Sequence, residues 1–487
     1  MSPEPQRRWW PSLAVDALAV VTFILIVVRA FRVADVNWDT LQYHWSYAAR
    51  AAGICDPQCL AFDSGIDVRY HGFPMVYHWA YGMLWRIFGT PLAGHALTIG
   101  AVVALCVELR RRFEVPLAWS WLAFLAIPLV QIHLSASYAD VVANAAITLA
   151  LIVLVDLLVT RRLATFADLA IAAVALATAA GTKLQIIPVA GLAWLAIAIV
   201  AIVARRRRDG RFPWAFAAGL AVAGIIAVLP QALANLWRFH NPFYPIAFSI
   251  AGHVFPGEET VAIIQQASSL GTQWKDTPSA VRWLASVLEF DAFRGRSMPW
   301  TIDQGDVLQS SPSFRMGGYF VAYVIGLVAL IVSRSRAREL RPLVGVMAAV
   351  TLLCALLPNS HELRYYMFWM LMLVASVLIA AFAPAFAGRA QPALRRDSGA
   401  LVLIALASVV LMTGAAYLKT SGMHIRDLVA PTDAVVDALA PGSTLCVANR
   451  DRHAILYSRA FHPNSDIHVR MLQDADAPGC TKVITLP

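Results

Sequence analysis

The chain has 487 residues, of which 59% are hydrophobic and only 14% are charged. Soluble domains average about 25% charged residues, so this composition excludes a large soluble enzyme and indicates an integral membrane protein. The formal net charge of +9 does not indicate nucleic-acid binding, because most of the cations lie in short clusters between apolar runs.

About eleven of these apolar runs approach the ~20 residues that a helix needs to cross the hydrocarbon core of a bilayer. We therefore expect an all-α polytopic membrane protein. In chain order the runs lie near 11–31, 91–109, 116–134, 141–160, 165–181, 186–204, 213–231, 316–333, 342–358, 366–387 and 399–418.

Clusters of arginine recur after every second span, and the positive-inside rule places them in the cytoplasm together with the N-terminus. The first run lacks a small-residue cleavage site and is expected to stay as an anchor. The clusters are Arg7 and Arg8, "RRR" at 110–112, "RR" at 161–162, "RRRRDGR" at 205–211, "RSRAREL" at 334–340 and "GRAQPALRR" at 388–396.

The opposite loops then face the periplasm and hold most of the mass outside the membrane. They are a first loop at about 32–90, a second loop at about 232–315 and a tail at 419–487. Residues 73–89 are apolar but short and rich in Trp and Tyr, which predicts a helix lying in the membrane interface. The tail mixes helix-like and strand-like segments and predicts a small α/β domain appended to a membrane module at 1–418.

Cysteine usage fits an oxidising outer compartment. Cys55 and Cys59 lie in the first loop, and Cys446 and Cys480 lie in the tail, which favours two disulfides. Four unpaired thiols are the alternative that the sequence leaves open.

The segment "ADVNWDTLQYHWSYAAR" at 34–50 places two carboxylates beside aromatic residues at the end of the first span. Asp35 and Asp39 are four residues apart and would share one face of a helix. Asp39 precedes Tyr43 and His44, and partial burial there would raise its pKa, which suits a general base. Asp140 is a further acid, at the outer end of a later span.

Two cations stand alone at the outer boundary. Lys183 lies in "AAGTKLQIIP", and Arg364 lies in "PNSHELRYYMFW" next to His361, Glu362 and Tyr365. Snorkelling to lipid headgroups is the simpler interpretation, especially for Lys183. The sharper one is a site for the phosphate of an anionic lipid, because arginine can clamp two oxygens and lysine supplies a point charge.

Two further polar groups in the first and second loops have competing interpretations. In "NLWRFHNPFYP" at 235–245 the prolines indicate a rigid loop, while Arg238 or Asn241 would be a substrate contact in the alternative. His44, His71 and His78 leave open a divalent-metal site, although their spacing does not favour one and aromatic packing explains them equally well.

The order and sidedness of these motifs resemble the GT-C superfamily of membrane glycosyltransferases, whose members include polyprenyl-phosphate-sugar-dependent enzymes of bacterial envelopes. The pattern covers roughly residues 10–390. It comprises the first-loop Asp39, an aromatic segment ending in "FG", Asp140, the solitary "TK" turn and the late "RY". "HNPFYP" resembles a G-N-P-x-x-P loop, with His240 where glycine is usual.

The resemblance implies transfer of a sugar, with inversion, from a polyprenyl-phosphate donor to a glycolipid, polysaccharide or protein on the periplasmic side of a bacterial inner membrane. Asp39 would act as the base, oriented by Tyr43 or His44, and Asp140 would face the same cavity. Lys183 and Arg364 would lie near the phosphate. A transporter of an envelope precursor or anionic solute is the alternative, and a non-catalytic scaffold is a third. No nucleic-acid partner and no cofactor besides the open metal alternative is expected.

Overall fold

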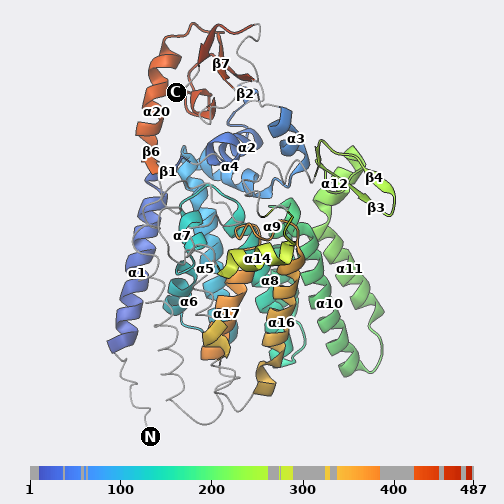
Figure 1. Ribbon diagram of the computed structural model, residues 1–487. Helices are drawn as coiled ribbons and strands as arrows, with labels where there is room; N and C mark the ends of the chain where they lie inside the picture. The colour runs from blue at the N-terminus through green and yellow to red at the C-terminus, as the bar shows by residue number, and fades with distance from the viewer. Residues whose placement is uncertain are drawn as a thin grey trace.

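The computed structural model describes residues 10–36, 39–55, 60–61, 64–260, 274, 276–288, 324–328, 337–383, 422–448, 454–472 and 479–484. A bundle of apolar helices forms the body of the molecule, and short helices and small sheets cover one end of it (Figure 1). The predicted helical membrane architecture is therefore present in the described part of the chain.

Four helices of the described chain are long and apolar enough to cross a membrane. The central one, α8, is mostly buried because other helices surround it, whereas α1 exposes most of its apolar surface. They are α1 (Trp10–Ala30), α5 (His95–Phe113), α8 (Asp140–Thr160) and α10 (Ile187–Asp209).

Shorter apolar helices complete the bundle. α9 (Phe166–Ala180), α16 (Ala337–Leu356) and α17 (Phe368–Phe382) correspond to predicted spans. α11 (Trp214–Val228) covers most of the span predicted at 213–231, and α12 (Pro230–Phe239) follows it at a bend of 65°, close to the predicted end of that span. Pro230 stands at the start of α12, where its missing N–H costs no helical hydrogen bond.

The span predicted at 116–134 is also wrong as a single helix. It consists of α6 (Leu117–Leu125) and α7 (Pro128–Leu134), and Ile127 between them is extended, with ψ of 115°. A proline disfavours helical geometry in the residue before it, which explains the break. The expected count of eleven is not established, because 399–418 and most of 316–333 lie outside the described residues.

The charged residues separate to the two ends of the bundle. Arg110, Arg111 and Arg112 occupy the last turn of α5, and Arg112 forms an ion pair with Asp156 near the end of α8. At the other end Asp140 begins α8 and pairs with Lys183. Because α8 has 21 residues, the two ends lie roughly 30 Å apart. Which end faces the cytoplasm stays a prediction.

The layer over the Asp140 end contains α2 (Trp45–Ala51), α3 (Ser64–Gly72) and α4 (Val76–Phe88). The helix predicted within 73–89 is thus confirmed as α4. It packs closely on α2 at Gly82, where there is no room for a side chain. A Cβ at this position would lie 2.1 Å from the carbonyl oxygen of Ala48. A fourth short helix, α14 (Ser279–Leu288), crosses the end of α16 (Figure 1).

The C-terminal segment adds α20 (Ile425–Asp437) and a parallel sheet with the strand order β2-β8-β7-β9. β2 comes from the first loop, so the sheet joins that loop to the tail. A second link is the antiparallel pair of β1 (Val33–Asp35) and β6 (Gly422–His424). The sheet strands are β2 (Leu60–Ala61), β7 (Thr444–Ala448), β8 (His468–Leu472) and β9 (Lys482–Ile484).

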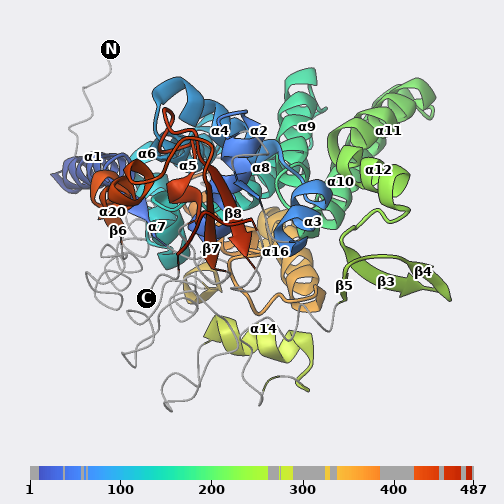
Figure 2. The same cartoon turned by 90° about the horizontal axis from the view of Figure 1, so that it is seen from above.

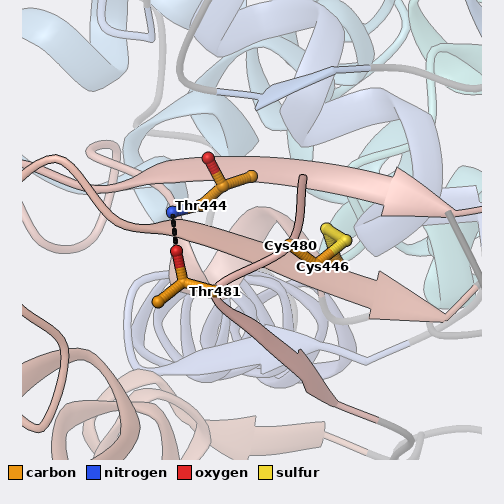
Figure 3. The surroundings of a disulfide bond; sticks show 4 residues. All are labelled: Thr444, Cys446, Cys480 and Thr481. Atoms are coloured by element: carbon orange, nitrogen blue, oxygen red, sulfur yellow. Dashed lines mark hydrogen bonds between the residues drawn. A yellow bond between two sulfur atoms is a disulfide. The ribbon is translucent and has the colours of Figure 1, made fainter. Parts of the chain in front are cut away.

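A disulfide fixes this sheet. Cys446 of β7 is bonded to Cys480, and the Thr444 N–H donates to Thr481 Oγ1 beside it at 3.0 Å (Figure 3). Cys55 is also disulfide-bonded, whereas Cys59 lies outside the described residues. The alternative of four unpaired thiols is therefore wrong.

Candidate active site

Asp39 forms an ion pair with Arg364, a residue 325 positions later in the chain. Arg364 Nη1 donates to Asp39 Oδ2 at 3.0 Å, and both side chains are largely buried. Asp39 immediately precedes a π-helix at Thr40–His44, a rare geometry that occurs often at functional sites. Arg364 lies in the turns between α16 and α17. The first loop and the last predicted outer turn thus meet.

Asp140 and Lys183 form the second ion pair. Lys183 Nζ donates to Asp140 Oδ1 at 2.5 Å, and Asp140 is 1% exposed. Asp140 lies in the first turn of α8, where the positive end of the helix dipole stabilises a carboxylate. Lys183 precedes the short 3₁₀ helix Leu184–Ile186 that leads into α10.

Tyr365 connects the two pairs. Its ring centroid lies 4.8 Å from Lys183 Nζ and 5.2 Å from Arg364 Cζ. Arg364 also lies over Tyr138, at 5.4 Å. Both cations therefore contact the ring of Tyr365. We call Asp39, Asp140, Lys183 and Arg364 the Asp39–Asp140 cluster.

Burial sets the protonation of two residues in this region. It raises the pKa of Tyr365 to about 12, so the phenol keeps its proton at neutral pH. It also lowers the pKa of Lys183, while the Asp140 carboxylate opposes that shift. An anion that reached this ammonium would further favour its charged form.

Tyr43 and His44 adjoin the cluster, as the sequence predicts. Burial and the Asp39 charge raise the pKa of Tyr43, whose ring lies 4.2 Å from that of His44. His44 Nδ1 lies 2.9 Å from His78 Nε2, so a single proton bridges the two rings. Burial lowers the pKa of both histidines, that of His78 to about 3, and both rings are neutral at pH 7.

Asp35 occupies a different position from the one expected. It belongs to strand β1 and accepts a hydrogen bond from Thr40 Oγ1 at 2.7 Å, and the charge of Arg29 acts near it. The expected helical face shared with Asp39 is wrong, because the chain is extended at Asp35 and becomes helical only from Asp39.

Of the two second-loop candidates, Asn241 has a structural role. The amide nitrogen of Asn241 donates to the carbonyl oxygens of Ile246 and Pro256, and its oxygen accepts from the N–H of Phe243. These bonds hold the start of the sheet β4-β3-β5, formed by β3 (Ile246–Ile250), β4 (His253–Phe255) and β5 (Glu259–Thr260). Arg238 is exposed in the last turn of α12. Neither arrangement supports the substrate contact.

His361 and Glu362 are buried close to Arg364 in sequence. His361, however, lies near the charge of Arg282 on α14, which together with burial lowers its pKa to about 4. The polar group predicted around Arg364 therefore divides, with Tyr365 in the Asp39–Asp140 cluster and His361 facing α14.

Asn144 is a positioning residue that the sequence reasoning missed. Its amide nitrogen donates to the carbonyl oxygens of Asp140 and Arg364, and its oxygen accepts from the N–H of Phe368. These bonds fix the Arg364 turn on α8. Tyr138 was missed as well, although Tyr138, Asp140 and Asn144 form an unusual polar run at the end of an apolar span. This polar run is the sequence feature from which Tyr138 and Asn144 could have been predicted.

The metal alternative has no geometric support. Within the ranges that the structure describes, no three His, Cys, Asp or Glu side chains lie close enough to hold a metal ion. His71 instead approaches Asp67 at 3.6 Å, and His44 and His78 contact each other.

Three solved structures are similar to the whole chain. ArnT from Cupriavidus metallidurans bound to undecaprenyl phosphate has a TM-score of 0.53 at 12% identity, covering 96% of this chain and 86% of its own. The same protein in the apo state has a TM-score of 0.41 at 15% identity, covering 96% and 87%. Arabinofuranosyltransferase AftD from Mycobacteria has a TM-score of 0.41 at 16% identity, covering 94% and 31%.

No protein-family model and no curated protein sequence matches the chain. The two TM-scores of 0.41 are too low to indicate a shared fold by themselves. The TM-score of 0.53 to ArnT in its lipid-bound state shows that this chain shares the fold of that protein. This is the GT-C fold that the sequence resemblance predicts.

Proposed function

We propose that the chain is a membrane glycosyltransferase that takes a sugar from a polyprenyl-phosphate donor. The observation that carries the proposal is the convergence of Asp39, Lys183 and Arg364, which lie far apart in the sequence, on one buried region beside Tyr365. The fold shared with a protein that binds undecaprenyl phosphate supports the choice of donor.

The cations would stabilise the leaving group. When the bond between the sugar anomeric carbon and the phosphate oxygen breaks, the lipid phosphate gains negative charge. Lys183 and Arg364 both lie close to the ring of Tyr365, and the charge of Arg364 acts on Lys183, so both would be near one phosphate. Positive groups fixed in advance in a region with little water stabilise such charge strongly.

Asp39 would receive the proton of the acceptor hydroxyl. This carboxylate pairs with the Arg364 guanidinium, and it would accept the proton in its ionised form. The acceptor oxygen then bonds to the anomeric carbon as the lipid phosphate departs, so a single displacement inverts the sugar. Asp140 orients Lys183, and Tyr43 lies close enough to the Asp39 charge to orient the acceptor.

The transporter alternative is less well supported. Transporters commonly bind their substrate near the middle of the membrane, at broken helices. Here the bent pair of α11 and α12 carries Arg238 on its exposed surface, whereas the Asp39–Asp140 cluster lies at one end of α8. We further propose that this end faces the periplasm from a bacterial inner membrane, on the sidedness of the arginine clusters. The acceptor would then be an envelope glycolipid, polysaccharide or protein.

The test is transfer by the purified protein from a panel of radiolabelled polyprenyl-phosphate sugars to extracted envelope acceptors. The wild type is expected to consume at least one donor, and Asp39→Asn to consume it far more slowly. Asp427→Asn, an exposed acid on α20, is the matched control and should keep wild-type activity. A wild type that consumes no donor of the panel, or an Asp39→Asn variant as fast as the wild type, contradicts the proposal.

A further inference from the structure

Helix α14 presents a polar face to the bundle. Ser279, Arg282, Trp283 and Ser286 recur at helical spacing and point inward, since Arg282, Trp283 and Ser286 are all buried. The opposite face exposes Val281 and Leu284. Seen from above, α14 lies at the edge of the bundle, beyond α16 (Figure 2). A helix with this position and an apolar outer face suits the membrane surface.

Two contacts fix this face against the helices below it. Ser279 Oγ donates to the carbonyl oxygen of Leu357 at 3.0 Å, at the end of α16. Trp283 packs edge-on against Trp369 of α17, with ring centroids 5.2 Å apart. The side chains between these contacts are therefore held in place and are not free to reach solvent.

Four buried polar atoms between α14 and the turn before α17 make no hydrogen bond with any residue that the structure describes. They are Arg282 Nε, Ser286 Oγ and both ring nitrogens of His361. Arg282 is 7% exposed, Ser286 is fully buried and His361 is 1% exposed. Buried polar groups in native proteins almost always have partners, so four orphans in one place require an explanation.

The guanidinium of Arg282 is the most demanding of these groups. Among the residues that the structure describes, no carboxylate forms an ion pair with it, and the neutral ring of His361 lies near it. A buried charge without a counter-charge is strongly destabilising. A bound anion would supply that counter-charge, and it would also accept hydrogen bonds from Ser286 and His361.

We propose that Arg282, Ser286 and His361 form an anion site for a phosphate group, separate from the Asp39–Asp140 cluster. Arginine, a hydroxyl and a neutral imidazole N–H are donors that match phosphate oxygens. The phosphate belongs to a lipid headgroup or is free in solution, and this chemistry is the same in both. The site does not depend on the proposed transferase activity.

The experiment is a thermal-unfolding titration of delipidated protein with inorganic phosphate, against chloride at equal ionic strength. Arg282→Met is expected to need at least tenfold more phosphate than the wild type for the same rise in Tm. Phosphate that binds at the Asp39–Asp140 cluster would raise the Tm of both proteins. The Arg282 site is therefore measured by the difference between the Tm rise of the wild type and that of Arg282→Met. His361→Gln should show an intermediate loss, and Arg426→Met, an exposed arginine on α20, should respond as the wild type does.

A second measurement separates a ligand site from a structural role. Without phosphate, Arg282→Met should unfold at the same temperature as the wild type or higher, because it removes an uncompensated charge. Repeating the comparison in nanodiscs of phosphatidylcholine with and without phosphatidylglycerol identifies the source. A response confined to phosphatidylglycerol supports a lipid headgroup, and a response to inorganic phosphate supports a free anion. Equal responses of wild type and Arg282→Met to both probes, or a less stable phosphate-free Arg282→Met, overturn the proposal.

Discussion

The two ends of the helix bundle both bury a group of ion pairs, but the two groups differ in how their charges are used. At one end Arg112 pairs with Glu108, with Asp156 at 2.7 Å and with Asp168 at 2.8 Å. Arg162 pairs with the same two aspartates. We call these five residues the Arg112 cluster. At the other end the Asp39–Asp140 cluster contains the ion pairs Asp39–Arg364 and Asp140–Lys183.

In the Arg112 cluster each acid pairs with two arginines. Asp156 and Asp168 each contact two guanidiniums, and Asp168 also accepts from the N–H of Thr165 as part of the capping box of α9. The cluster thus ties α5, α8 and α9 together. In the Asp39–Asp140 cluster Lys183 pairs with Asp140 and Arg364 pairs with Asp39, and both cations also contact the ring of Tyr365. We expect the Arg112 cluster to contribute mainly to stability, and we propose that the Asp39–Asp140 cluster receives the phosphate of the donor.

The largest effect on function is expected from Asp39→Asn. The amide cannot take the acceptor proton, so the rate of sugar transfer should fall by about 10²–10⁴-fold. The apparent Tm in detergent should fall because the ion pair is lost, but less than on removal of the side chain, because the amide oxygen can still accept from Arg364. A much lower Tm for Asp39→Asn, together with wild-type transfer by the protein that remains folded, would contradict this prediction. It would show that the Asp39–Asp140 cluster, like the Arg112 cluster, serves mainly stability.

The largest effect on stability is expected from Arg112→Met. It leaves Glu108 and two aspartates with fewer counter-charges in a buried position, so the free energy of unfolding should fall by about 3–5 kcal/mol. Denaturant titration in detergent measures this loss, with the exposed Arg206→Met as the control. Transfer by the protein that remains folded should be unchanged. Slower transfer by the protein that remains folded would contradict this prediction and would show that the two ends are functionally coupled.

Lys183→Met should sharpen the comparison within the Asp39–Asp140 cluster. Loss of one fixed donor to the leaving phosphate is expected to slow transfer by about 10²-fold, the scale seen for removal of one donor to a developing oxyanion. Lys183→Arg keeps the charge and should recover part of the rate. Equal rates for the two variants would show that the positive charge at this position does not act on the leaving group.

The smallest expected effect is the pH dependence of stability. Burial lowers the pKa of His78 to about 3, from an ordinary value near 6.5 in the unfolded chain. The unfolded state therefore binds more protons between these values, and the free energy of unfolding falls as the pH drops below 6.5. At pH 5 this one histidine accounts for about 2 kcal/mol. His78→Asn should lose correspondingly less stability between pH 7.5 and 5, and an unchanged slope would contradict the buried neutral pair with His44.

The sequence alone predicted most of the helices in the described part of the bundle, because long apolar runs report directly on helix length. It failed where a local feature overrode hydropathy. Pro128 breaks the run that contains it into α6 and α7. Strand β2 joins the C-terminal sheet through a pairing of distant segments, which no local pattern reveals.

For the site, the sequence identified the charged residues but not their partners. Solitary cations at the outer boundary stood out because an isolated charge there is costly, and Lys183 and Arg364 were found in this way. Their pairing with Asp140 and Asp39 depends on how α8, α10 and the first loop pack, which is a tertiary property. The same limit separates Asp35 from Asp39 and hides Asn144, whose polar side chain satisfies backbone groups of another segment.

Binding of undecaprenyl phosphate tests most directly whether the Asp39–Asp140 cluster is a lipid-phosphate site. The measurement compares the dissociation constants of the wild type, Lys183→Met, Arg364→Met and the opposite-end control Arg206→Met, all checked for equal Tm. The account predicts at least tenfold weaker binding for each of the first two variants and wild-type binding for the control. Wild-type affinity in both Lys183→Met and Arg364→Met would contradict it.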